Sequence, residues 1–167
     1  SDYGRLTAAL ALAELYEAVL PWRQPEPEAY ELLLRSLRRL ESHSKPEVAF
    51  VWAQLALLSQ TGFLPQFESC VQTGVPVAEA EPFISPTAGG YVVAEHAAYL
   101  HDRLRTRAEV LYGLARTAQL DEPPASLKYA HECSAVLYAC WRHVADRPLP
   151  GLDTYINESR DLGSPSA

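Results

Sequence analysis

The sequence predicts a mainly α-helical fold, a single helical domain of about five to six helices with a short irregular or β insertion, the knuckle, at residues 63–93. Apolar residues recur at helical spacing in several segments, and prolines and glycines separate these segments. The helical period disappears only between Gly62 and Tyr91. A chain of 167 residues has the usual length of one domain. We therefore assign residues 1–157 to the helical domain and residues 158–167, rich in Ser, Gly and Pro, to a disordered tail.

Three helices are predicted in the first part of the chain. The first covers residues 6–20 and the second residues 27–42, where Pro27 suits a first helical position because that position needs no N–H donor. The third covers residues 47–60, with Ser44 and Glu47 as a capping box and Gly62 as its C-terminal stop. Apolar side chains surround nearly the whole of this third helix, which predicts a central position in the core.

The rest of the chain predicts short strands followed by helices. Residues 75–77 and 91–93 are the best β candidates within the knuckle. Helical character returns over residues 94–120, with a break near Thr106. A last helix begins at Pro124 or Ala125 and runs to about residue 144, and Pro150 and Gly151 follow its end.

Charge and cysteine content exclude several classes of protein. Fourteen Lys and Arg residues against 21 Asp and Glu residues give a net charge of −7, which argues against a protein that coats DNA. Three cysteines, Cys70, Cys133 and Cys140, are too few for a disulfide framework and predict a cytoplasmic protein. No apolar run is long enough to predict a membrane span. Since methionine is absent, we expect the chain to start inside a longer protein.

No motif predicts catalysis. His131-Glu132-Cys133 resembles the start of a zinc-protease helix, but the position of the second histidine is Ala135. Gly89-Gly90 lacks the further glycine and lysine of a phosphate-binding loop, and no cysteine has a base immediately beside it. We therefore expect a non-enzymatic protein with no cofactor and no bound metal.

One basic cluster is the candidate binding site. Arg35, Arg38 and Arg39 lie at i, i+3 and i+4 of the second predicted helix, so their guanidinium groups share a face. The ordinary interpretation of such a face is a solvated surface. The functional interpretation is that this face, or Arg103 with Arg107, binds a carboxylate or phosphate, because arginine binds both in a bidentate way.

Several segments together resemble the helical C-terminal part of RecO, a family of bacterial recombination mediators. The resemblance rests on a leucine-rich helix that ends in Gly62-Phe63-Leu64-Pro65, a turn from Cys70 to Gly74, and Phe83-Ile84-Ser85-Pro86 leading into Gly89-Gly90. Residues 12–21 and 147–149 also resemble the family, so the similarity covers most of the chain. The order and spacing of these short pieces agree with the family's pattern.

Two departures from the family pattern change what the resemblance implies. Where the family places four zinc-binding cysteines, this chain has Cys70, Thr73, Val93 and His96. Threonine and valine are not useful zinc ligands, and two remaining ligands cannot complete a tetrahedral structural site. We therefore expect a knuckle held by packing and not by metal. The family also begins with a DNA-binding OB-fold, and no such β pattern precedes Leu6.

The resemblance implies a non-enzymatic mediator of recombinational DNA repair that works with RecR. The helical part would then be a protein-interaction domain for RecR and for the acidic, apolar-ended tail of the single-strand-binding protein. Contact with single-stranded DNA would be weak or would belong to an OB module. The competing hypothesis is an unrelated all-helical ligand-sensing or scaffold domain with a pocket between its helices.

Overall fold

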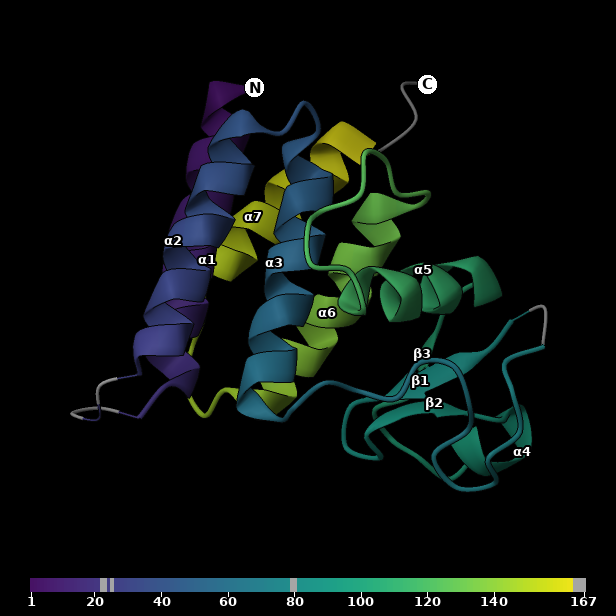
Figure 1. The fold of residues 1–167 in the computed structure, drawn as a ribbon. Helices are drawn as coiled ribbons and strands as arrows, with labels where there is room; N and C mark the ends of the chain where they lie inside the picture. The colour runs from purple at the N-terminus through teal and green to yellow at the C-terminus, as the bar shows by residue number, and fades with distance from the viewer. Residues whose placement is uncertain (22–23, 25, 79–80, 164–167) are drawn as a thin grey trace.

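The fold is mainly helical, as predicted. The computed structural model describes residues 1–21, 24, 26–78 and 81–163, the last three by their backbone alone (Figure 1). Within these residues there are seven helices: α1 (Asp2–Val19), α2 (Pro27–Ser42), α3 (Pro46–Thr61), α4 (Ala94–Ala97), α5 (Ala108–Ala118), α6 (Ala130–Val144) and α7 (Pro150–Gly163). Three short strands, β1 (Phe83–Ser85), β2 (Gly90–Val92) and β3 (Leu104–Arg105), form one antiparallel sheet in the order β2-β1-β3. None of the helices in this part of the chain has both the length and the apolar character that crossing a membrane requires.

Helix α3 is the centre of the core, which confirms the prediction from its apolar circumference. It packs against α1, α2, α5 and α6 (Figure 1). Its side chains are buried over almost its whole length: Val48, Ala49, Phe50, Val51, Trp52, Ala53, Gln54, Leu55, Leu57 and Leu58. The helix ends at Gly62, which has a φ of 82°. This left-handed conformation is the reason a glycine stands at that position.

The predicted capping box of α3 is wrong. Lys45 occupies the cap position, and no side chain caps the helix there. Pro46 opens the helix instead, because its ring fixes φ and its missing N–H would have had no partner in the first turn. The backbone N–H of Lys45 donates to Nδ1 of His43 at 2.8 Å, so the local contact comes from histidine and not from Ser44.

A seventh helix follows the one predicted to be last. Pro150 and Gly151 begin α7 and do not simply follow the end of α6. The carboxylate of Glu14 on α1 accepts hydrogen bonds from the backbone N–H groups of Gly151 (2.8 Å) and Leu152 (3.0 Å), which are free donors at a helix start. The helix continues to Gly163, through the first part of the predicted tail, and residues 164–167 lie outside the described part of the chain.

The knuckle supplies two of the three strands, β1 and β2, and only one of the two predicted strands corresponds to either of them. Residues 75–77 form no strand and make only an isolated bridge between Pro76 and Ser69, flanked by hydrogen bonds from the Cys70 N–H to the Val75 carbonyl (2.8 Å) and from the Val77 N–H to the Glu68 carbonyl (2.9 Å). The strand predicted at 91–93 is shifted by one residue to β2, and its partner β1 pairs Phe83 with Val92 and Ile84 with Tyr91. The sheet and α4 lie together at one end of the helical body, below α5 in Figure 1.

The helix predicted over residues 94–120 is also wrong as a single element. It is replaced by α4, β3 and α5. Asp102 explains the long interruption: one carboxylate oxygen accepts the Ser85 hydroxyl at 2.6 Å and the other accepts the Thr87 N–H at 2.8 Å. These bonds hold residues 101–105 against β1, where Leu104 and Arg105 add a third strand.

The start of α6 differs from the prediction as well. The helix begins at Ala130, after Tyr129 in the left-handed conformation (φ 59°), and not at Pro124 or Ala125. Residues 120–124 remain irregular because the carbonyls of Leu120 and Pro124 accept hydrogen bonds from Trp52 on α3 and from His43 in the turn between α2 and α3. This loop borders the candidate site.

Candidate functional site

The three predicted arginines meet in one groove. Helix α2 buries Leu32, Ser36 and Leu40 against the body, which turns Arg35, Arg38 and Arg39 toward its outer side. A hollow of about 850 Å³ runs between α2, α3 and the loop after α5, and all three arginines line it. Its other lining includes Glu28, Glu31, Leu32, Trp52, Ala56, Leu120 and Asp121. We call this hollow the arginine groove.

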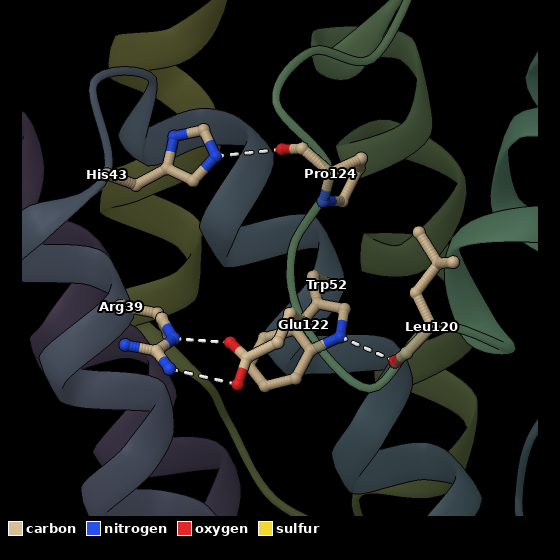
Figure 2. Close-up of polar contacts among 6 residues, drawn as sticks. All are labelled: Arg39, His43, Trp52, Leu120, Glu122 and Pro124. Carbon is tan, nitrogen blue, oxygen red and sulfur yellow. Dashed lines mark hydrogen bonds and ion pairs between the residues drawn. The ribbon is translucent and has the colours of Figure 1, made fainter.

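Arg39 is paired across the groove. Its guanidinium makes a two-pronged contact with the carboxylate of Glu122, in which Nη2 lies 2.9 Å from Oε1 and Nε contacts Oε2 (Figure 2). The hydrogen bond from Arg39 lowers the pKa of Glu122, and the same bond raises the pKa of Arg39. Both side chains are about half exposed, at 40% and 52%, so solvent screens the pair.

Arg35 contacts an aromatic ring. Its guanidinium carbon lies 5.8 Å from the centre of the Trp52 ring, within the range of a cation–π contact. Trp52 itself is 1% exposed, and its indole N–H donates to the carbonyl of Leu120 at 2.9 Å (Figure 2). The buried tryptophan therefore joins the arginine face to the loop after α5.

Arg38 is exposed and, unlike Arg35 and Arg39, makes no hydrogen bond, ion pair or ring contact among the described residues. The groove is not uniformly basic, since Glu28, Glu31 and Asp121 line it too. Spacing along α2 predicted the shared arginine face. Glu28 and Glu31 lie on α2 itself, whereas Asp121 comes from the loop after α5, which spacing along α2 does not predict. Glu122 is 83 residues from Arg39, and no pattern in the sequence indicates that pairing.

A histidine fixes the same loop at a third point. Nε2 of His43 lies 2.8 Å from the carbonyl oxygen of Pro124 (Figure 2). Its Nδ1 accepts the N–H of Lys45. Because a carbonyl only accepts, the proton of the neutral ring is on Nε2. Arg39, Trp52 and His43 thus hold the loop residues Glu122, Leu120 and Pro124 respectively.

The knuckle does not fit a zinc ion. The Cys70 sulfur is 1% exposed and accepts the N–H of Val93 at 3.4 Å. Burial opposes ionisation of this thiol, but hydrogen bonds from the Thr73 hydroxyl and from the N–H groups of Val93, Gln72 and Thr73 outweigh it, and the pKa of Cys70 is lowered. Two segments, one at residues 72–73 and one at Val93, therefore meet at Cys70. Thr73 and Val93 supply no ligand atom for zinc.

The other chemical candidates take structural positions. Cys133 and Cys140 lie in the core, where burial raises the pKa of each thiol to about 12, which makes them poor nucleophiles. Arg107 pairs with Glu132 at 2.9 Å, and Arg103 donates to the carbonyl of Leu100, so these two arginines do not form one site. Within the described ranges, no group of three or more His, Cys, Asp or Glu side chains is placed to hold a metal ion.

Comparison of the sequence with known proteins matches most of the chain to a family of DNA repair proteins. The family model "Recombination protein O C terminal" matches residues 1–153. The chain belongs to the RecO family. Proteins named DNA repair protein RecO are similar to it at 35% identity over 133 residues in Synechococcus elongatus and 30% over 153 residues in Gloeobacter violaceus. These alignments cover 75% and 89% of the chain.

The RecO-family chain spans about half the length of these curated relatives. The alignments cover 49% of the Synechococcus protein and 59% of the Gloeobacter protein. A third relative of the same name, from Rhodospirillum centenum, is 29% identical over 139 residues, which is 55% of its length. The resemblance predicted from short motifs is therefore confirmed at the level of the family.

Proposed function

We propose that this chain is the helical, protein-binding part of a DNA repair and recombination protein that acts without catalysis in the cytoplasm. Membership of the RecO family supports the repair role, because the relatives carry the name DNA repair protein. The arginine groove supports protein binding. Its arginines would hold the acidic residues of the single-strand-binding protein tail, and Leu32 and Ala56 would contact the apolar end.

RecR is the second partner that we propose, by resemblance to the family, and no particular surface is assigned to it. Single-stranded DNA is not a main ligand of this part in our proposal. The net charge of −7 repels phosphate, and the arginines of the groove are balanced by nearby carboxylates. A groove with mixed charge suits a peptide better than a nucleic acid backbone.

The single observation that carries the proposal is that three arginines from one turn of α2 line one groove beside apolar side chains. The test is titration of a fluorescently labelled acidic-tail peptide of the single-strand-binding protein against the wild type and against Arg35→Glu/Arg38→Glu/Arg39→Glu. Rim charges mainly set the association rate and the salt sensitivity of binding. The triple reversal should therefore slow association, and added salt should no longer weaken binding, because it now screens a repulsion.

A single reversal makes the test cleaner. Arg38→Glu breaks no contact recorded in the described structure, whereas reversal of Arg39 also removes the ion pair to Glu122. Arg147→Glu is the matched control, since Arg147 is exposed and lies in the loop between α6 and α7, outside the groove lining. Weaker binding by Arg38→Glu and not by Arg147→Glu supports the groove. Equal binding by all proteins places the peptide elsewhere. Tail capture is rejected if the peptide binds neither the wild type nor a variant that lacks the Glu122 charge.

A further inference from the structure

One wall of the arginine groove is an acidic segment of the same chain, and its Glu122 carboxylate already binds Arg39. We call residues 120–124, Leu120-Asp121-Glu122-Pro123-Pro124, the strap. Three side chains fasten it: the Trp52 indole donates to the Leu120 carbonyl, the Arg39 guanidinium binds the Glu122 carboxylate, and His43 donates to the Pro124 carbonyl (Figure 2). The strap thus combines an acidic pair with apolar neighbours, which is the chemistry that the proposed partner would bring.

The strap is held by weak contacts. None of its five residues is buried, and Leu120 is 42% exposed. The ion pair between Arg39 and Glu122 is partly solvated, and such pairs contribute little to stability. Pro123 and Pro124 have no N–H groups, so they donate no backbone hydrogen bond to the body. A segment of this kind can move away from Arg39 without unfolding the core beneath it.

We propose that the strap is an internal competitor for the arginine groove, in which Glu122 occupies Arg39 until a carboxylate of an acidic peptide replaces it. The inference rests on the proposed function, since it concerns the regulation of the same site. Arg38, which has no partner among the described residues, and Arg35 on the Trp52 ring receive the peptide first. One carboxylate then replaces another on Arg39, so this guanidinium keeps a charged partner throughout the exchange.

The competition has a quantitative consequence for affinity. A site that must first release its own occupant binds with an affinity reduced by the fraction of molecules in which it is free. Removing the charge of Glu122 while keeping the size of its side chain should raise that fraction. Because an exposed ion pair is weak, we expect Glu122→Gln to tighten peptide binding by about threefold to fivefold.

The matched control is Glu31→Gln. Glu31 lines the same groove and carries the same charge, but it makes no contact with Arg39 in the described structure. Removing the charge of Glu31 makes the groove less negative without freeing an arginine. The Glu31→Gln substitution should therefore tighten peptide binding by less than about twofold. Circular dichroism and thermal unfolding of both variants would show that the fold is retained.

A spectroscopic readout follows the strap directly. The indole N–H of Trp52 bonds to the strap, whereas the indole N–H of Trp141 bonds to the buried side chain of Gln54 at 3.0 Å. In ¹⁵N-labelled protein, peptide addition should shift the Trp52 indole signal, assigned by its loss in Trp52→Phe, and leave the Trp141 signal in place. Glu122→Gln without peptide should move the Trp52 signal in the same direction.

The outcomes separate the two proposals. Tighter binding by Glu122→Gln than by Glu31→Gln, together with the Trp52 shift, supports the competing strap, and so does binding seen only after Glu122→Gln. Equal affinity of the wild type and both variants overturns the strap proposal but leaves tail capture standing. Binding that leaves the Trp52 signal unchanged also overturns it. If neither the wild type nor Glu122→Gln binds the labelled peptide, both proposals fail.

Discussion

Replacing either of two buried tryptophans by phenylalanine should lower the free energy of unfolding, but by different amounts. Trp141 is fully buried and donates its indole N–H to the side-chain oxygen of Gln54, which is itself 1% exposed. Trp52 is equally buried, but its partner is the carbonyl of Leu120, a residue with 42% exposure. Water can therefore replace the lost donor at Leu120 and cannot do so at Gln54.

The two losses of stability can be worked out from this difference. Each substitution removes the smaller part of an indole ring from the core, at a cost of about 1–2 kcal/mol. Trp141→Phe also leaves a buried amide oxygen without a donor, which adds about 1–3 kcal/mol. We therefore expect the free energy of unfolding to fall by about 1–2 kcal/mol in Trp52→Phe and by about 2–5 kcal/mol in Trp141→Phe.

Urea denaturation followed by far-ultraviolet circular dichroism measures both losses. The control is Trp141→Phe/Gln54→Leu, in which both polar partners are gone. Replacing both partners by apolar groups is nearly neutral, so the double variant should regain about 1–2 kcal/mol relative to Trp141→Phe. Equal losses in the two single variants, or no recovery in the double variant, would refute the argument from the exposure of the partner.

Four further predictions concern other parts of the molecule. Glu14→Ala should lower the free energy of unfolding by about 1 kcal/mol, measured by urea denaturation, because it removes the cap of α7, whereas Glu17→Ala, an exposed neighbour on α1, should have little effect. The hydrogen bonds from Ser85 and Thr87 outweigh burial and lower the pKa of Asp102, so its contribution to stability is full above its unfolded pKa near 4 and is lost as the pH falls. The difference in unfolding free energy between the wild type and Asp102→Asn should therefore shrink from pH 7 to pH 3, and a constant difference would contradict the assignment. Elemental analysis should find no stoichiometric zinc in the wild type, whereas Thr73→Cys/Val93→Cys should bind cobalt(II) with thiolate charge-transfer bands; one zinc per wild-type chain would reject the metal-free knuckle. The isolated chain should bind single-stranded DNA weakly, and sub-micromolar affinity at physiological salt in a fluorescence titration would contradict this.

Local periodicity predicted those features of the helices that depend only on residues within the same helix. The central position of α3 followed from apolar residues on all sides, and the shared arginine face of α2 followed from the i, i+3 and i+4 spacing. The start of α7 was missed because its cap is Glu14, more than 130 residues away on α1. Pro150 and Gly151 are ordinary helix breakers when no distant carboxylate receives the freed N–H groups.

The sequence by itself determined the helical class, the core helix, the family resemblance and the arginine face. Each of these depends on residues close together in the chain or on short motifs in order. Only the tertiary structure decided what those arginines contact, because Glu122 and Leu120 reach the groove from a loop that sequence periodicity leaves undefined. The same holds for the knuckle, where Asp102 ends a helical pattern by binding Ser85 and Thr87. Hydrogen bonds between distant segments offset the local preferences of the chain, and no local pattern records which segments will meet.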